Sequence, residues 1–239
     1  MIAEFPEGDG IFETIKTISG VPFALDRHIG RATRSAVILG IPIPKSEEIA
    51  FAVEALLDKT PDELKFGRLR MSFDKSGELE LLHETYHPWV DPARLMILDS
   101  PIDENSATVG IKTLPFTQHI ECLTVAREHG FDDGVRFNLK GEVSETAVSN
   151  LLLKVEDRWV TPSLSSGCLP GITRGLALEW FDIEEVTVTQ DDLAQATSIY
   201  LLSSLKDAQP VSMLEGKTLE IDTQLRQELL DRISHNSNP

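Results

Sequence analysis

Short apolar runs bounded by glycine or proline turns alternate along the chain with segments in which apolar residues recur every three or four positions. The first pattern is typical of strands and the second of amphipathic helices. Strands are predicted at residues 11–18, 21–25, 68–74, 79–84, 95–99, 133–139, 142–155, 158–161, 184–189 and 198–202. Helices are predicted at 27–39, 46–58, 116–129 and 223–233, and two more are expected to begin near residues 173 and 191.

Polar residues mark the predicted helix starts and a domain boundary. Asp26 and Ser46 stand directly before helical segments, where their side chains are expected to act as N-caps. Residues 100–108 are mostly polar and include a proline, which is typical of a linker. A chain of 239 residues can form two small domains, each with its own core. We therefore expect an N-terminal domain at 1–99 and a C-terminal domain at 109–239.

The charge balance is strongly acidic, with 22 basic and 39 acidic residues and a formal net charge of -17 at pH 7. Such a surface disfavours nucleic acid and anionic membranes as partners, because both would be repelled. It still allows an anionic small molecule in a local basic pocket. No apolar run approaches membrane-spanning length, and the first residues lack a signal-peptide pattern. Cys122 and Cys168 lack disulfide-framework or zinc-site spacing, so we expect packed free thiols, no metal and a cytoplasmic protein.

Two features between residues 140 and 174 indicate chemistry rather than packing. Glu145 stands in a predicted strand, where an acid contributes nothing to an apolar core. Gly171, Ile172 and Thr173 stand at a predicted helix start. The first N–H groups of a helix lack intrahelical partners, and the helix dipole adds positive potential, so such a start binds anions. A buried acid together with a phosphate cradle suggests a phosphorylated, nitrogen-containing cofactor.

The same residues belong to a longer set of motifs. Glu145 and Asn150 form E-x-x-x-x-N, followed by T-P at 161–162 and L-P-G-I-T-R at 169–174, while G-D-G-I-F-E-T opens the chain at 8–14 and H-x-x-R-x-x-x-S-A follows at 28–36. This set resembles the class IV aminotransferases, the fold-type IV pyridoxal phosphate enzymes. The resemblance implies an α/β fold of the α+β type, with pyridoxal 5'-phosphate between two domains. It also implies a homodimer, with loops of the neighbour closing the site. Seven residues precede the G-D-G motif here, fewer than in the family, so a leading strand pair is expected to be shortened or absent.

Pyridoxal phosphate chemistry needs a lysine that forms an imine with the cofactor aldehyde and then moves the substrate's proton. Lys112 lies 33 residues before Glu145, which matches the family spacing, so the resemblance assigns Lys112 as the catalytic lysine. Glu145 is then expected to keep the pyridine nitrogen protonated. Lys140 is the rival by proximity, but its place in a turn favours a solvated side chain. Phe116, expected to border the substrate, replaces a tyrosine that is frequent in the family, and it has no hydroxyl to donate.

The resemblance also assigns the groups that bind anions. Arg31 is the arginine of the second motif and is expected to bind the cofactor phosphate, since a guanidinium suits phosphate geometry. The backbone of Ile172 and Thr173 and the residue Ser204 are expected to complete the phosphate cup. Taken alone, Arg31 would be a solvated helix arginine and Ser204 a plain loop serine. Arg70 stands where a strand arginine of the family binds the substrate carboxylate, and an edge-strand arginine is the alternative.

Three functions remain open at this point. Residues 203–211, SSLKDAQPV, resemble the N-S-L-x-x-x-x-P-V pattern of 4-amino-4-deoxychorismate lyase, with Ser203 in place of Asn. That enzyme releases pyruvate and forms 4-aminobenzoate for folate biosynthesis. The second reading is a transaminase for branched-chain or D-amino acids, which would use the same lysine and glutamate. The third is a cofactor-binding protein of weak activity, suggested by the short N-terminus and Phe116, against which the retained lysine, glutamate and arginine argue.

Overall fold

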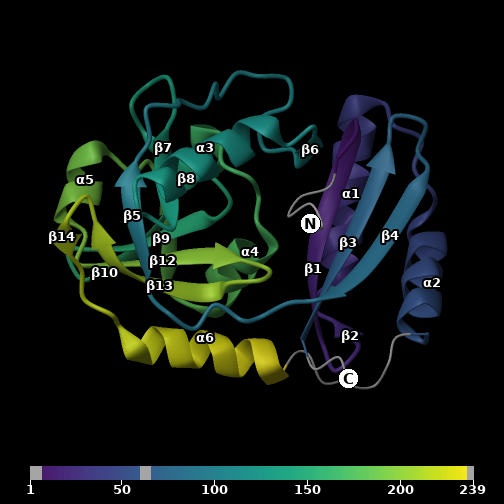
Figure 1. Cartoon of the computed structure of the whole chain (residues 1–239). Coiled ribbons are helices and arrows are strands. Elements are labelled where there is room, and N and C mark those ends of the chain that lie inside the picture. The colour runs from purple at the N-terminus through teal and green to yellow at the C-terminus, as the bar shows by residue number, and fades with distance from the viewer. Residues whose placement is uncertain (1–6, 60–65, 236–239) are drawn as a thin grey trace. The chain divides into compact units, whose positions relative to one another are not determined.

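The structure, a computed structural model, describes residues 7–59 and 66–235 (Figure 1). The segment before G-D-G therefore lies outside the described residues, apart from Glu7. The chain forms two compact units. The first unit contains the residues up to Pro88, the segment Ile111–Phe116 and the residues from Arg232 onward, whereas the second contains Trp89–Gly110 and Thr117–Asp231.

The first unit is an antiparallel sheet with two helices. The strand order is β2-β1-β3-β4, and β6 also pairs with β1. The strands are β1 (Gly10–Ile18), β2 (Val21–Pro22), β3 (Phe66–Asp74), β4 (Leu79–Thr85) and β6 (Thr113–Leu114). The helices are α1 (Leu25–Leu39) and α2 (Ser46–Leu57).

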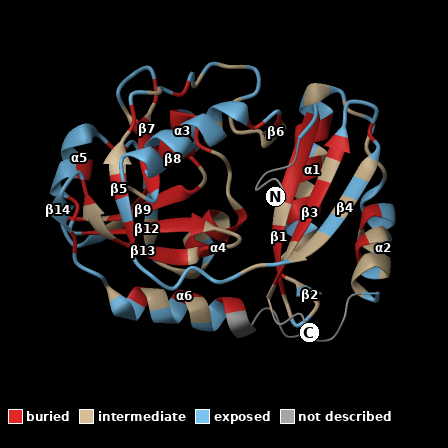
Figure 2. Cartoon of the chain, in the orientation of Figure 1, coloured by how far each residue is buried: buried red, intermediate tan, exposed pale blue. Residues whose placement is uncertain are grey.

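Alternation along the strands divides this sheet into two faces. One face packs against α1 and α2 and forms a buried core, drawn red in Figure 2. Its sheet and helix residues include Ile11, Ile15, Leu69, Met71, Phe73, Ile29, Ala32, Ile49 and Val53. The intervening positions of β1 and β3 point to the opposite face, and there Thr14 pairs with Arg70 and Lys16 with Arg68. The helix-packed face is therefore mainly apolar, with Glu13 as its charged member on β1, whereas the opposite face carries Lys16, Arg68 and Arg70.

The second unit is built on a mixed sheet with the strand order β11-β10-β9-β12-β13-β5-β7-β8, and β14 pairs with β13. The strands are β5 (Ala93–Ile97), β7 (Asp133–Phe137), β8 (Val143–Thr146), β9 (Asn150–Val155), β10 (Arg158–Pro162), β11 (Ile183–Val186), β12 (Ser198–Ser203), β13 (Asp207–Leu214) and β14 (Lys217–Thr218). The helices are α3 (Thr117–Glu128), the 3-10 helix η1 (Leu164–Ser166), α4 (Ile172–Trp180), α5 (Gln190–Gln195) and α6 (Thr223–His235), of which the residues up to Asp231 belong to this unit.

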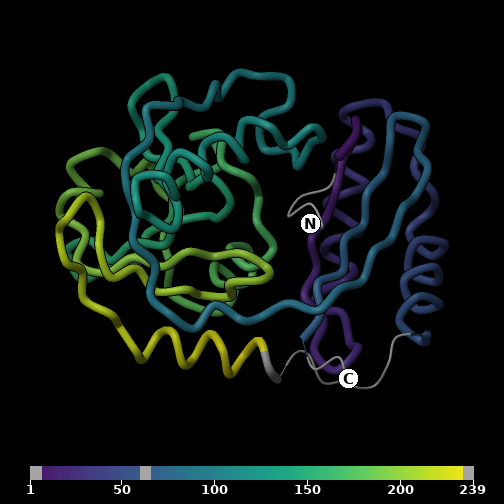
Figure 3. The backbone as a smooth tube through the Cα atoms, viewed as in Figure 1, coloured from purple at the N-terminus to yellow at the C-terminus, as the bar shows by residue number. Residues whose placement is uncertain are grey.

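Two buried clusters hold the second unit together. The larger one joins apolar residues of β5, β7, β8, β9, β12 and β13 with Leu193 of α5. The smaller one joins β9 and β12 with α4 and α6, through Leu152, Tyr200, Ala177 and Leu229. The C-terminal helix α6, yellow in Figure 3, thereby covers one side of this unit's sheet. The consecutive leucines at 151–153 are fully buried, as befits a central strand with both faces covered.

Several predicted boundaries are wrong for local reasons. The return strand at 21–25 ends at Pro22, because α1 begins at Leu25, whose side chain packs against the first unit's core. The N-cap of α1 is Ala24 and that of α2 is Lys45, so Asp26 and Ser46 lie inside their helices. The single strand at 142–155 is two strands, β8 and β9, separated by a turn that hydrogen bonds between Thr146 and Ser149 close.

The observed units also differ from the predicted domains. The segment 93–97 was expected in the N-terminal domain, but β5 pairs with β7 and β13 of the second unit. Lys112 was expected in the C-terminal domain, but β6 directly after it pairs with β1 of the first unit. Both differences arise from pairing between strands that are distant in sequence. None of the helices in the described part of the chain is long and apolar enough to cross a membrane.

Candidate active site

Lys112 lies directly before β6 and is held against β1. The Phe12 backbone N–H donates to the Lys112 carbonyl at 3.0 Å. The Lys112 Nζ lies 4.2 Å from the ring centroid of Phe12 and 4.5 Å from that of Phe116. The two rings meet edge to face with their centroids 5.1 Å apart. An ammonium group over aromatic faces is attracted by the ring quadrupoles, so these rings fix the position of the amine.

A buried acid and two basic side chains lie between β1 and α1. Arg31 donates from Nε to Glu13 Oε1 at 2.8 Å and from Nη2 to Oε2 at 2.6 Å, and His28 Nδ1 lies 2.7 Å from Oε2. Burial would raise the pKa of Glu13, but Arg31 and His28 outweigh it and lower that pKa to about 2. Burial lowers the pKa of His28 in spite of Glu13, and the charges of Arg31 and Lys112 lower it further. The group therefore consists of an ionised acid, an arginine fixed along one edge and a neutral histidine.

Arg70 lies in β3, which has β1 on one side and β4 on the other. Its side chain is buried, opposite Thr14 of β1 and Leu82 of β4. The alternative of an edge-strand arginine is therefore wrong. Burying a cation costs free energy unless anionic or hydrogen-bonding groups contact it. Arg70 therefore remains a candidate for binding a carboxylate.

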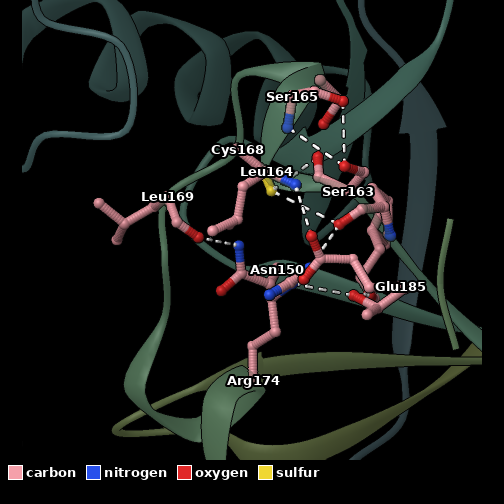
Figure 4. A network of polar contacts seen from close by, with 12 residues as sticks. Asn150, Ser163, Leu164, Ser165, Cys168, Leu169, Arg174 and Glu185 are labelled. Atoms are coloured by element: carbon pink, nitrogen blue, oxygen red, sulfur yellow. Dashed lines mark hydrogen bonds and ion pairs between the residues drawn. The ribbon is translucent and has the colours of Figure 1, made fainter. Parts of the chain in front are cut away.

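In the second unit Glu145 lies in β8 and is buried. Its Oε2 accepts from the Leu169 backbone N–H at 3.0 Å and from Asn150 Nδ2 at 3.3 Å. Asn150 Nδ2 also donates to the Leu169 carbonyl at 2.9 Å, a contact drawn in Figure 4. Glu145 of β8 and Asn150 of β9 are thus hydrogen-bonded to the turn that precedes α4. These bonds fix the Glu145 carboxylate in place.

At the start of α4 the backbone lies close to a neighbouring side chain. Gly171 is the N-cap, and no side chain among the described residues caps this helix. A Cβ atom added at Gly171 would lie 1.9 Å from Asn150 Oδ1, so only glycine fits. The first two helical residues, Ile172 and Thr173, are buried, and no acid stands in the first turn, Ile-Thr-Arg. Backbone N–H groups at an uncapped helix start with no acid in the first turn are suited to an anion.

Arg174 connects the start of α4 to β10 and β11 by hydrogen bonds. Its Nη2 donates to the Pro162 carbonyl at 2.7 Å and to Glu185 Oε2 at 2.7 Å, and its Nε donates to Thr161 Oγ1 at 3.2 Å (Figure 4). The buried Cys168 lies close by. Burial and the charge of Glu145 raise the pKa of its thiol to about 11, so this thiol is unreactive near neutral pH. Arg174 and Cys168 therefore belong to the support of the site.

Ser204 lies in the turn that joins β12 and β13. Two residues later, Lys206 Nζ lies 3.3 Å from Oδ2 of the fully buried Asp133. The same oxygen accepts from Thr146 Oγ1 at 2.9 Å, and Thr146 directly follows Glu145 in β8. The Ser204 turn is thereby fixed relative to the strand that carries Glu145.

The predicted site residues fall into two groups. Those in the first unit are Arg31, Arg70, Lys112 and Phe116, and those in the second are Glu145, Ile172, Thr173 and Ser204. Within the first unit the structure brings Lys112 and Phe116 into contact, and within the second it joins Glu145 to the turn before Ile172. The rival lysine, Lys140, is exposed in a turn and lies 3.4 Å from Glu104, in agreement with a solvated side chain.

Comparison with known proteins assigns the family. The profile of the family Amino-transferase class IV matches residues 10–214 of this chain. The chain belongs to the class IV aminotransferases.

Its relatives in this family carry different activities. The chain is 26% identical over 234 residues to a D-alanine aminotransferase of Bacillus licheniformis, covering 89% of this chain and 81% of the relative. It is 26% identical over 193 residues to an aminodeoxychorismate lyase of Bacillus subtilis, covering 73% of this chain and 65% of the relative. Its structure is similar to that of a candidate 4-amino-4-deoxychorismate lyase from Legionella pneumophila, with a TM-score of 0.87, 23% identity and coverage of 98% and 97%. These findings confirm the family resemblance and the mixed α/β fold.

Enzymes of this family depend on pyridoxal phosphate, and the described residues fit that cofactor. The start of α4 offers backbone N–H groups to a phosphate, and the glycine at 171 is required by its contact with Asn150. Glu145 is a buried carboxylate of fixed orientation, as a partner for a ring nitrogen must be. Lys112 is the lysine in the described part of the first unit that would supply the amine.

Two residues of the candidate site were given no role from the sequence. Phe12 lies under the Lys112 amine, and Glu13 fixes Arg31. Both stand in the G-D-G-I-F-E-T motif. The available signal was Glu13 itself, an acid that alternates with Ile11 and Ile15 and so falls on the apolar face of its strand. Phe12 gave no such signal, because an aromatic residue in a strand is ordinary.

Proposed function

We propose that this class IV family member is a pyridoxal phosphate-dependent 4-amino-4-deoxychorismate lyase. The observation that carries this choice is the sequence of the β12–β13 turn, where SSLKDAQPV at 203–211 resembles the lyase pattern. The identity to the Bacillus subtilis lyase supports it. The reaction breaks the bond between the ring carbon and the enolpyruvyl oxygen, releases pyruvate and leaves 4-aminobenzoate.

The chain's own residues have definite roles in this proposal. Bound pyridoxal phosphate supplies an electron sink for the carbon that bears the substrate amine. Lys112 takes the proton from that carbon at its Nζ, and the rings of Phe12 and Phe116 hold Nζ in position. The Glu145 carboxylate holds a proton on the ring nitrogen and so strengthens the electron sink.

The anionic groups are bound by other residues. The phosphate is held by the backbone N–H groups of Ile172 and Thr173, by Arg31 and by Ser204. Glu13 keeps the Arg31 guanidinium in one orientation for this contact. Arg70 binds a carboxylate of the substrate.

The test is product formation without an amino acceptor. The cofactor-loaded protein is incubated with 4-amino-4-deoxychorismate in the absence of any keto acid, and 4-aminobenzoate and pyruvate are followed. We expect both products in equal amounts. Lys112→Ala should abolish turnover, whereas Lys140→Ala, which removes the exposed rival lysine, should leave it unchanged. A protein that shows the cofactor's absorbance but forms no product would overturn the lyase assignment.

A transaminase for D-amino or branched-chain amino acids is the second candidate. The observation that favours it is the identity to the D-alanine aminotransferase, which extends over 81% of that relative. This reaction returns the proton to the cofactor carbon and needs a keto acid to complete its cycle. Conversion of the cofactor to a stable amine form by an amino acid alone, without pyruvate release from 4-amino-4-deoxychorismate, would establish it.

We also propose that the protein acts as a cytoplasmic homodimer, as the family resemblance implies. Sedimentation velocity of the cofactor-loaded protein should give twice the mass of 26.5 kDa. A single species at the monomer mass, under conditions where the enzyme turns over, would contradict this proposal.

A further inference from the structure

Two parts of the second unit are proposed to contact different ends of the cofactor. Glu145 on β8 is the proposed partner of the ring nitrogen, and Ser204 in the β12–β13 turn is one of the proposed phosphate ligands. Both residues lie in the second unit. Pyridoxal phosphate carries its nitrogen and its phosphate group at different positions of one rigid ring. Its affinity therefore depends on how well the chain fixes these two contacts relative to each other.

The β12–β13 turn is a short hairpin loop. Ser203 pairs with Asp207, so the loop between them consists of Ser204, Leu205 and Lys206. The Lys206 backbone N–H donates to Ser203 Oγ at 3.2 Å. Because only a few backbone dihedral angles separate Lys206 from Ser204, a contact that holds the lysine also restricts the serine.

The Lys206 side chain is held by a buried carboxylate. Its Nζ lies 3.3 Å from Oδ2 of Asp133, and the two side chains are 7% and 0% exposed. The same Nζ lies 5.3 Å from the ring centroid of Trp89. A buried charge pair is screened much less by water and salt than a surface pair. This contact therefore holds the loop in one position.

The same carboxylate also holds the strand that carries Glu145. Asp133 Oδ2 accepts from Thr146 Oγ1 at 2.9 Å, and Oδ1 accepts from the Ala147 backbone N–H at 3.0 Å. Oδ1 also accepts from the Gly134 backbone N–H at 2.9 Å. Thr146 and Ala147 directly follow Glu145 in the sequence. One side chain at the start of β7 thus connects the β12–β13 loop with β8.

We infer that Lys206 is a positioning residue for the cofactor, which through Asp133 fixes the phosphate-binding loop relative to the Glu145 carboxylate. The inference rests on the proposed function, because it takes the proposed roles of Ser204 and Glu145. The lyase pattern N-S-L-x-x-x-x-P-V leaves the position of Lys206 unspecified. The pattern therefore gives no reason for a lysine there, whereas the pair with Asp133 does.

The experiment compares pyridoxal phosphate with pyridoxal, which has the same ring and aldehyde but no phosphate group. Equilibrium dialysis against the cofactor-free chain gives the Kd of each. Lys206→Met nearly preserves the shape of lysine and removes its charge. We expect it to raise the Kd of pyridoxal phosphate about 10- to 100-fold, because the phosphate-binding loop is no longer held in place. The Kd of pyridoxal should stay unchanged, because Asp133 keeps its three other hydrogen bonds and still holds the strand of Glu145.

Two further variants separate this effect from a general loss of charge. Lys206→Arg keeps the positive charge and should recover most of the affinity for pyridoxal phosphate. The matched control is Lys154→Met. Lys154 Nζ also lies 3.3 Å from an aspartate, Asp222, and 5.8 Å from the ring centroid of Trp159. These charged side chains are 28% and 23% exposed and are assigned no role in the site, so the control should leave both Kd values unchanged.

Circular dichroism establishes that each variant is folded, and Lys206→Gln, which keeps a hydrogen-bond donor, replaces Lys206→Met if the latter does not fold. Equal losses of affinity for both ligands in a folded variant, or no loss for either, would overturn the inference. A loss in Ser204→Ala but none in Lys206→Met would reject the inference alone and keep the phosphate role of Ser204. A selective loss in Lys206→Met of a protein that forms no 4-aminobenzoate would support the inference and show that the lyase assignment is wrong.

Discussion

Residues on the two faces of β1 have opposite environments although they are neighbours in sequence. Glu13 lies among the apolar residues of the helix-packed face, where only its contacts with Arg31 and His28 offset the cost of burial. Phe12 points to the other face and lies under the Lys112 amine. One strand of the family motif therefore both fixes the proposed phosphate arginine and orients the proposed catalytic lysine.

The buried Glu13 carboxylate predicts a pH-dependent stability. Its folded-state pKa of about 2 lies below the ordinary value of 4.5, so its contribution is fully present above pH 4.5 and is lost as pH falls toward 2. Glu13→Gln should lower the free energy of unfolding at pH 7 by about 3–5 kcal/mol, because it leaves Arg31 buried without its counter-charge. Urea unfolding at pH 7 and pH 3 measures this loss, which should be smaller at the lower pH.

The matched control for Glu13 is Glu54→Gln on the exposed side of α2. It removes the same charge and should change the free energy of unfolding by less than about 0.5 kcal/mol. If Glu13→Gln and Glu54→Gln changed the free energy of unfolding equally at pH 7 and pH 3, the buried contacts of Glu13 would not be the source of the loss.

The substitution Glu145→Gln removes the negative charge of this side chain and nearly keeps its shape. The cofactor should stay bound, because the phosphate contacts proposed at the start of α4 do not involve this side chain. Turnover should fall about 100- to 1,000-fold, since the amide cannot hold a proton on the ring nitrogen as a carboxylate does. Steady-state kinetics with cofactor absorbance recorded in parallel measures both quantities. A near-normal rate would rule out the proposed role.

At the scale of elements, the start of α4 depends on one glycine. Gly171→Ala would place a Cβ atom 1.9 Å from Asn150 Oδ1, so Asn150 must move and its bonds to Glu145 and Leu169 are lost. We expect at least a tenfold weaker affinity for pyridoxal phosphate and a loss of about 1–3 kcal/mol in stability. Equilibrium dialysis and thermal unfolding measure the two effects.

Gly175 provides the control within the same helix. Among the described residues no atom lies within 4 Å of a Cβ added there, and the position is interior to α4. Gly175→Ala should therefore raise stability by about 0.5–1 kcal/mol through helix propensity and leave cofactor affinity unchanged. Equal losses of affinity in both variants would mean that the space at Gly171 has no special role.

Sequence patterns located most elements because their signals are local. The alternation at 11–18 and the helical spacing at 27–39 and 116–129 correspond to β1, α1 and α3 within a few residues. The start of α1 was misplaced because Ala24 adopts a left-handed conformation with a φ of 52°, which its side chain gives no reason to expect.

The site residues show the same limit. Motif spacing identified Lys112 and Glu145 as candidates, yet it could not show that Phe12 lies under the Lys112 amine or that Glu13 holds Arg31. Those contacts join residues that are separated in sequence and depend on strand register, which no local pattern encodes.

For the whole molecule, the order of the chain does not match the order of its units. It enters the second unit after Pro88, returns to the first for Ile111–Phe116, and leaves again at Thr117. Lys112 therefore belongs to the first unit through the pairing of β6 with β1, although Glu145 follows it in the second. The residues assigned to the proposed chemistry are therefore divided between the two units.

This connectivity predicts how fragments behave. A fragment of residues 1–99 carries β5, whose Ala93 and Leu95 are fully buried in the second unit's core and would be exposed to water. It also lacks the segment 111–116, which pairs with β1 and packs Phe116 on Phe12. We expect this fragment to bind a hydrophobic dye and aggregate. A fragment of residues 1–88 joined through a long flexible linker to 111–116 should instead be monomeric and about 1–3 kcal/mol more stable than 1–88 alone. Urea unfolding of the last two fragments measures the difference, and equal stability would mean that the segment around Lys112 is not part of the first unit's fold.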